Sequence, residues 1–109
     1  MASIEDLSKI DLRIGRIKNV EDIDGARSPV YKLEVYLGEE IGSRTIVAGI
    51  KNSYSKEDLL NKQLVCITNL EPKKIANVFS EGMILATGEG ENIILLSPEK
   101  EAIDGSIVR

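Results

Sequence analysis

The chain has 109 residues, a net charge of −4, and 42% hydrophobic and 29% charged residues. This length suits one domain with a single core, so residues 1–109 are expected to form one unit. The sequence contains no histidine, which excludes a Ser-His-Asp triad, a Cys-His dyad and any zinc site that uses histidine. No metal or cofactor site is expected.

The chain also lacks the segments that would direct it to or through a membrane. Residues 1–7 have neither a basic start nor a long apolar stretch, and no run approaches the roughly 18 apolar residues of a membrane span. The single cysteine, Cys66, lies in the apolar run 64–67 and is expected to pack as a small hydrophobic residue. These features predict a cytoplasmic protein. An enzyme is the less favoured class, and no catalytic residue is predicted.

The first half of the chain reads as three strands. Residues 12–19 have mixed faces, typical of a long curved strand whose inner face changes partway, with Gly15 as the point where it bends. Residues 31–37 alternate cleanly, and 44–50 form a third strand after a turn at 38–42. The alternation in the second run predicts these core residues: Tyr31, Leu33, Val35 and Leu37.

One helix is predicted next. Ser55 and Asp58 have the spacing of a capping box, Leu59 and Leu60 would form the buried side, and Asn61 would cap the end. The remaining segments are expected in this order: a strand at 63–70, a loop at 73–81 after Pro72, a hairpin of 83–87 and 92–96 around a turn at 88–91, and a tail at 103–109.

This order predicts an all-β fold. Three strands, a short helix and further strands match the OB-fold, a five-stranded Greek-key barrel with a short helix between strands three and four. The pattern alone leaves other small barrels and sandwiches open.

Charge is distributed unevenly along the chain. Residues 44–80 contain six basic and three acidic residues, a net +3, whereas residues 81–109 contain two basic and six acidic residues, a net −4. A basic segment can attract phosphate even in an acidic protein, because the local field decides the interaction. An ordinary solvated surface is the alternative interpretation of the same lysines.

Five motifs in order resemble the tRNA-binding domain family. That family includes C-terminal domains of methionyl-tRNA synthetases, stand-alone tRNA-binding proteins, EMAP-type cytokine precursors and CsaA-type chaperones. The matching segments are Asp11–Ile17, Thr45–Ile50, Asn69–Ile75 (Asn-Leu-Glu-Pro-Lys-Lys-Ile), Ser80–Leu85 (Ser-Glu-Gly-Met-Ile-Leu) and Asp104–Ser106. The resemblance covers about residues 8–107 and makes the OB-fold the expected fold.

Three positions depart from the family pattern, and one stretch is similar to a particular branch. Ala48 stands where many members have Ser, Asn77 where Gly is common, and Ala76 where a basic residue is frequent. Asparagine tolerates a left-handed backbone, so the turn is expected to form with Asn77. The absence of a basic side chain at Ala76 removes one phosphate contact. The stretch 26–33 is similar to the chaperone branch, whereas 46–50 and 69–83 are similar to the synthetase-associated branch.

The resemblance implies a set of tRNA-contacting residues. Lysines beside Pro72 would act as point charges for phosphates, Ser80 would donate to a phosphate or ribose oxygen, and Met83 would pack under a sugar or base. The whole set is Arg13, Lys32, Asn52, Asn69, Lys73, Lys74, Ser80 and Met83. Structural alternatives remain for three of them: Arg13 could pair with Asp11 or Glu34, Ser80 could cap a turn, and Met83 could belong to the core.

The resemblance also implies partners. It predicts a non-catalytic protein that recognises the folded shape and backbone of tRNA and assists methionyl-tRNA synthetase in trans. Stand-alone members associate as homodimers, and apolar residues near both termini would suit such an interface: Ile4, Leu7, Ile10, Ile103, Ile107 and Val108. The alternative is a CsaA-type chaperone that binds unfolded peptides in a groove at the dimer interface.

Overall fold

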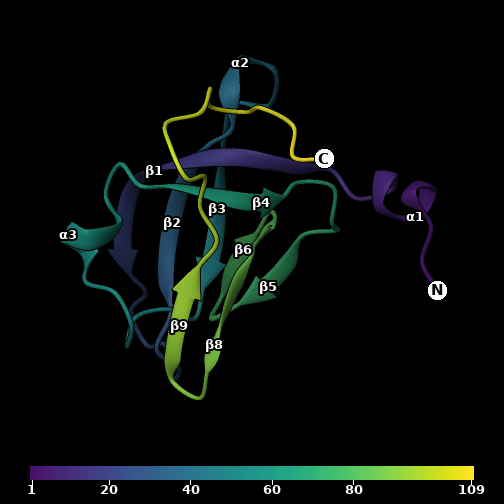
Figure 1. Ribbon diagram of the computed structural model, residues 1–109. Helices are drawn as coiled ribbons and strands as arrows, with labels where there is room; N and C mark the ends of the chain where they lie inside the picture. The colour runs from purple at the N-terminus through teal and green to yellow at the C-terminus, as the bar shows by residue number, and fades with distance from the viewer.

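A curved, antiparallel five-stranded sheet forms the body of the computed structural model, which describes residues 1–109 (Figure 1). The strands run in the spatial order β3-β2-β1-β4-β7. Their bounds are β1 Leu12–Asp22, β2 Tyr31–Tyr36, β3 Ser43–Ala48, β4 Gln63–Ile67 and β7 Met83–Ile84. The Glu81 amide donates to the Thr45 carbonyl at 2.8 Å and brings the last strand back towards β3. The sheet is thus a nearly closed barrel, which confirms the predicted OB-type fold.

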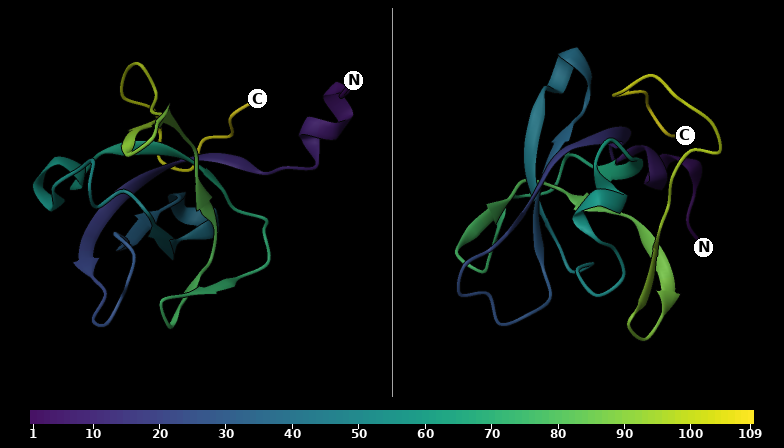
Figure 2. Two further views of the ribbon diagram at one scale, coloured as in Figure 1. Left: turned by 90° about the horizontal axis from the view of Figure 1, so that it is seen from below. Right: turned by 90° about the vertical axis from the view of Figure 1, so that its left-hand side faces the viewer.

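Two hairpins extend from this barrel (Figures 1 and 2). The first joins β5 (Lys73–Ile75) to β6 (Val78–Ser80), and the second joins β8 (Ala86–Glu89) to β9 (Asn92–Leu95). Three short helices complete the fold: α1 Ile4–Ser8, α2 Gly38–Ile41 and α3 Lys56–Leu59. None of these helices has the length needed to cross a membrane.

The long strand β1 is shared between two neighbours. Residues 12–16 pair with β4 and residues 16–22 pair with β2. The register shifts between Ile17 and Asn19, so the predicted change of inner face occurs at this bulge, beyond Gly15. Gly15 is needed for close packing, since a Cβ there would lie 2.5 Å from Cγ1 of Val35.

The core follows the predicted alternation of the second strand. All four of its predicted core residues are buried within a cluster of 13. Cys66 is also completely buried, and burial raises the pKa of its thiol to about 12. It packs as the small hydrophobic residue that the sequence predicts.

The helix α3 lies between β3 and β4 as predicted. Ser55 and Asp58 form a complete capping box, and Leu59 is fully buried. Leu60 is 49% exposed, so the prediction that it is buried is wrong. The helix ends at Leu59, Leu60 is the extended C-cap, and Asn61 follows it with a left-handed φ of 70°.

Several boundaries differ from the prediction. Residues 38–41 form a helical turn instead of a simple turn, and α1 was not predicted. Residues 73–80 form a hairpin instead of a loop, because Ala76 and Asn77 adopt positive φ values of 50° and 66° at its tip. The strand predicted at 63–70 ends at Ile67.

The two C-terminal segments also differ in detail from the prediction. The strand predicted at 83–87 is divided, because β7 pairs with β4 while β8 pairs with β9. The tail lies along the start of β1. The Gly105 amide donates to the Ile14 carbonyl at 2.7 Å, and the Val108 amide donates to that of Leu12 at 2.8 Å. Both chain ends therefore lie on the same side of the barrel (Figure 1).

Candidate nucleic-acid interface

A groove of about 470 Å³ opens between β3 and the β5–β6 hairpin. Val47 contributes from β3, where it lies outside the core cluster. The remaining lining residues come from the segment after β4 and from the first residue of β7: Leu70, Glu71, Lys73, Ile75, Ser80, Gly82 and Met83. OB-folds bind their ligands on this face and its adjoining loops, so the groove is the candidate interface.

The two consecutive lysines of the hairpin point to opposite faces, because side chains alternate along a strand. Lys73 lines the groove and pairs in register with Ser80. Lys74 pairs with Phe79 on the other face, and its Nζ lies 6.0 Å from the centre of the Phe79 ring. Phe79 is 61% exposed and offers an aromatic surface that sequence reasoning missed. The hairpin thus presents one cation on each side.

Ser80 and Met83 are both in the groove but differ in what they offer. The Ser80 hydroxyl accepts the Val47 amide at 2.9 Å and donates to the Gly82 carbonyl at 3.2 Å, and the residue is buried. Its hydroxyl is therefore engaged within the protein. This arrangement resembles the alternative interpretation in which Ser80 caps a turn. Met83 is 46% exposed and lies on the groove surface, outside the core cluster.

Lys32 and Asn52 lie at different distances from the groove. Lys32 pairs in register with Val47 on β3, which sets it at the edge of the groove on the same face of the sheet. Its ammonium lies 4.0 Å from a Glu21 carboxylate oxygen. Asn52 lies in the turn after β3 and does not line the groove. Its neighbour Ser53 bonds to the β8–β9 hairpin instead.

Arg13 is committed to an ionic network inside the protein. Its guanidinium donates to Asp11 at 3.1 Å and to Glu40 at 3.2 Å, and only 13% of the side chain is exposed. The hydrogen bond from Thr68, helped by Arg13, lowers the pKa of Asp11. The structure therefore shows the ion pair with Asp11 that the sequence offers as an alternative, and Glu34 takes no part.

Asn69 is likewise engaged by the backbone. Its Oδ1 accepts the Asp11 amide at 2.9 Å, and its Nδ2 donates to the Lys9 carbonyl at 2.8 Å. The predicted site residues thus fall into two groups. The groove brings together Lys73, Ser80 and Met83, with Lys32 at its edge and Lys74 behind the hairpin, while Arg13, Asn52 and Asn69 lie elsewhere.

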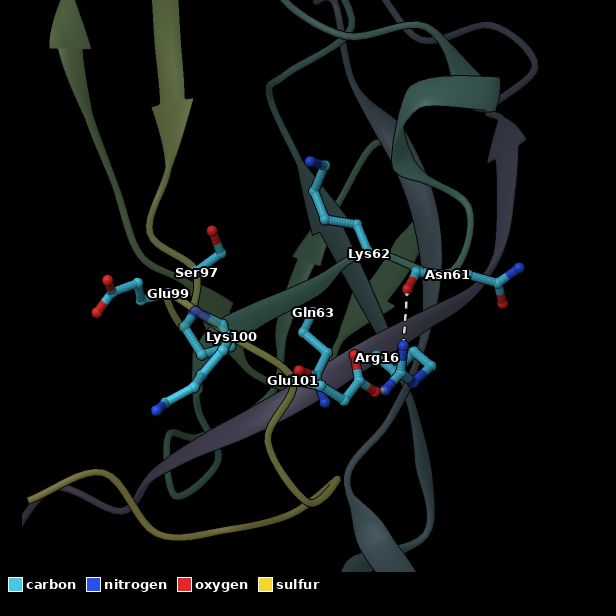
Figure 3. Close-up of a pocket in the computed structure, with 9 residues that line it drawn as sticks. Arg16, Asn61, Lys62, Gln63, Ser97, Glu99, Lys100 and Glu101 are labelled. Carbon is cyan, nitrogen blue, oxygen red and sulfur yellow. Dashed lines mark hydrogen bonds and ion pairs between the residues drawn. The ribbon is translucent and has the colours of Figure 1, made fainter.

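A second pocket, of about 250 Å³, is lined by polar residues around Arg16 (Figure 3). Arg16 donates to Asp104 at 3.2 Å, to the Asn61 carbonyl at 2.9 Å, and to Glu101. Burial would raise the pKa of Asp104, but hydrogen bonds from Gln63 and Arg16 lower it overall. Since the arginine ties residues 101 and 104 to β1 and to the Asn61 carbonyl, this pocket serves as a clamp for the C-terminal segment.

An apolar surface lies where the two termini meet. The cavity there measures about 340 Å³ and is lined by Ile4, Leu7, Ile10, Ile107 and Val108, among others. Ile4 is 87% exposed, and α1 projects from the barrel without burying any residue (Figure 1). Five of the six residues predicted from the sequence to suit a dimer interface therefore meet at this cavity. Ile103, which is 83% exposed, is not among its lining residues.

The family model described as "Putative tRNA binding domain" matches residues 12–107. The chain belongs to the tRNA-binding domain family. It is 50% identical over 107 residues to the methionine–tRNA ligase of Pyrococcus furiosus, a match that covers 98% of this chain and 14% of the ligase. The domain therefore spans about one seventh of the length of that relative.

Solved structures of two kinds resemble this tRNA-binding domain. The CsaA chaperone protein from Picrophilus torridus is 39% identical, with a TM-score of 0.92 and 100% of both chains covered. The MetRS-related protein from Pyrococcus horikoshii is 29% identical, with a TM-score of 0.88, covering 100% of this chain and 98% of that chain. The fold is common to synthetase-related and chaperone relatives, so side chains must distinguish their functions.

Proposed function

We propose that residues 1–109 act as one non-catalytic domain that binds the backbone of folded tRNA through the groove beside the β5–β6 hairpin. The observation that carries this proposal is the combination of an uncommitted Lys73 with the exposed Met83 on one groove surface. Lysine ammonium groups suit phosphates, and the methionine suits a sugar or base face.

The proposed interface has a centre and two flanks. Lys73 and Met83 form the centre, and Lys32 extends it along β2. Lys74 and Phe79 form the second flank, on the outer face of the hairpin, where a phosphate and an adjacent base could be held together. Arg13 and Asn69 are excluded from direct contact in this proposal, because their polar groups are already bonded within the protein.

The working form is proposed to be a homodimer. An isolated barrel leaves Ile4, Leu7 and Ile107 exposed on one surface, and a twofold axis through that surface would bury two copies of the set. Two grooves in one particle would double the surface available to one tRNA. A mass of about 12 kDa by light scattering at working concentration would contradict this part.

The cellular role is proposed to be assistance to methionyl-tRNA synthetase in trans, in the cytoplasm. The support is the 50% identity to a methionine–tRNA ligase segment. A tRNA held by this domain near a synthetase would raise the local tRNA concentration for the catalytic site.

Filter binding of total tRNA against increasing salt tests the ligand. We expect micromolar, salt-sensitive binding to many tRNAs and at least about tenfold weaker binding to unstructured RNA of equal length. Only a few phosphates are neutralised, so the salt slope should correspond to about two to four contacts. Equal affinity for the two RNAs would rule out recognition of the folded shape.

A chaperone role is the second candidate, favoured by the close likeness to the CsaA protein and by the apolar lining of the groove beside the β5–β6 hairpin, which in this proposal replaces the dimer-interface groove that the resemblance implies. It predicts that the domain slows aggregation of an unfolded client protein and that Met83→Lys removes this effect. Suppression of aggregation without any shift of tRNA at low salt would favour this candidate over the first.

A further inference from the structure

One side chain, that of Asn69, hydrogen-bonds the N-terminal segment to the barrel. Within residues 1–10, the hydrogen bonds of α1 and its caps are internal, and the one ion pair joins Lys9 to Asp6. The single hydrogen bond from this segment to the rest of the chain is the one that Asn69 Nδ2 donates to the Lys9 carbonyl. Lys9 is the C-cap of α1, so this bond acts at the point where the helix leaves the barrel.

The same amide also fixes the entrance to β1. Asn69 Oδ1 accepts the Asp11 amide, and the preceding residue, Thr68, donates its own amide to the Asp11 carbonyl at 2.9 Å. The Thr68 hydroxyl bonds to the Asp11 carboxylate as well. Residues 9–11 and 68–69 therefore form one tightly bonded junction.

This junction continues directly into the groove. Leu70, the residue after Asn69, is the first residue of this segment that lines the groove. On the other side, Arg44 donates to the Thr68 carbonyl and, at 3.4 Å, to the Glu81 carbonyl, two residues before Met83. Movement of α1 relative to β1 would thus act on a backbone whose next residues form the groove wall.

We propose that Asn69 is a positioning residue that couples the apolar surface of α1 to the tRNA-binding groove. It would orient α1 for association with a second copy, and through Thr68 and Leu70 that association would set the groove wall, so the loss of Asn69 should act on tRNA binding through dimerisation. This inference rests on the proposed tRNA binding and homodimer, and it assigns Asn69 a role other than contact with tRNA.

The chemistry of the side chain suits this role. Asparagine offers a donor and an acceptor on one short planar group, and here each is used by a different backbone group. Asn69→Asp keeps the acceptor and the shape but loses the donor to Lys9. It also brings a carboxylate to the Lys9 carbonyl oxygen. Asn69→Ala loses both bonds.

The test measures association and tRNA binding of the full chain together. Sedimentation gives the dimer dissociation constant, and filter binding of tRNA is run below and above that concentration. We expect both Asn69 variants to raise the dimer dissociation constant at least about tenfold, since each dimer contains the junction twice. Their tRNA binding should weaken at low protein concentration and return to within about twofold of the parent once they are dimeric.

Two further variants separate coupling from contact. Lys73→Ala should weaken tRNA binding at every concentration without changing association. Asn19→Ala, which removes another exposed asparagine bonded to Glu21 at 2.7 Å, should change neither. Circular dichroism and thermal unfolding identify a variant that fails to fold. If Asn69→Ala fails to fold, the isosteric Asn69→Asp is used in its place.

The outcomes are distinct. Weaker tRNA binding at all concentrations with unchanged association would make Asn69 a contact residue and overturn the proposal, as would no change in either measurement. A parent that binds tRNA as a monomer would overturn the homodimer and the coupling with it. A dimeric parent that binds no tRNA would overturn the proposed function, while a weakened dimer in the Asn69 variants would still support the orienting role.

Discussion

The β5–β6 and β8–β9 hairpins have the same construction and opposite charge. Each consists of two antiparallel strands joined by two residues, and each extends from the five-stranded sheet (Figure 2). The first carries Lys73 and Lys74, whereas the second ends in Glu89 and Glu91 around Gly90. The backbone of the hairpin therefore does not decide what it can bind. We infer that the side chains suit the first hairpin to bind phosphate and make the second unfavourable for any polyanion.

The comparison also shows which charges are available. Arg13 and Arg16 lie in the barrel wall and are each bonded to two carboxylates, whereas the hairpin lysines form no ion pair. Counting basic residues along the chain does not make this distinction. The four predictions below test the difference between the two hairpins and the difference between free and paired charges.

The largest effect is expected from reversing the charges of the hairpins. Lys73→Glu with Lys74→Glu should weaken tRNA binding at least about 100-fold at physiological salt, about 2.7 kcal/mol, because two attractive contacts become repulsive. Glu89→Lys with Glu91→Lys is the matched control and should change the affinity less than about fivefold. Equal effects from the two pairs, measured by filter binding, would show that only net charge matters.

Acid should weaken the ionic clamp between Arg16 and Asp104, which holds the C-terminal segment. The pKa of Asp104 is lower in the folded protein than in the unfolded chain, where it is about 3.9, so its stabilising contribution is present above that value and is lost as the pH falls below it. Asp104→Asn should cost about 2 kcal/mol at pH 7, since it removes the ionic partner of Arg16. Urea unfolding at several pH values should show a smaller loss below pH 4 in this variant than in the parent.

Exchange of the turn residues should move stability in opposite directions. Ala76 has a φ of 50° and Gly90 a φ of 59°, a region that favours glycine. Ala76→Gly should therefore stabilise the protein, and Gly90→Ala should destabilise it, each by about 0.5–1 kcal/mol in thermal unfolding. A loss of stability in Ala76→Gly would mean that the alanine side chain contributes more than the strain relieved.

The smallest effect is expected from removing a single lysine, measured in the salt dependence of tRNA binding. Lys100→Ala removes one exposed positive charge from the C-terminal segment and should leave the salt dependence of tRNA binding unchanged. Lys73→Ala removes the same charge from the groove and should reduce the slope of log affinity against log salt by about one. Identical slopes for the two variants would place Lys73 outside the interface.

Sequence reasoning was effective where periodicity reflects burial. The alternation at 31–37 predicted four core residues because each faces a closed barrel interior. The capping box at Ser55 located α3, yet the equivalent pair Ser3 and Asp6 at α1 was missed. Its apolar residues Ile4 and Leu7 were interpreted as a dimer surface, and because the helix has only five residues and buries none of them, no core-facing pattern indicated a helix.

The candidate site was harder to predict because its geometry depends on pairing. Residues 73–75 and 78–80 are too short to show a period, and an alanine with positive φ is an unusual turn residue. Without the pairing, the sequence did not reveal that Lys73 and Lys74 face opposite sides. It also did not reveal that Ser80 points inward or that Asn69 bonds to Lys9 and Asp11. These outcomes depend on contacts between residues far apart in the chain.

The burial of Cys66 has a practical consequence for spectroscopy. A thiol that is inaccessible and has a pKa of about 12 is almost entirely protonated at neutral pH, so maleimide reagents should leave it unmodified. A cysteine introduced by Asn77→Cys at the tip of the β5–β6 hairpin could then carry the only fluorophore, without removal of the native residue. Energy transfer between a donor-labelled copy and an acceptor-labelled copy would report the distance between their β5–β6 tips in the proposed dimer, with and without tRNA.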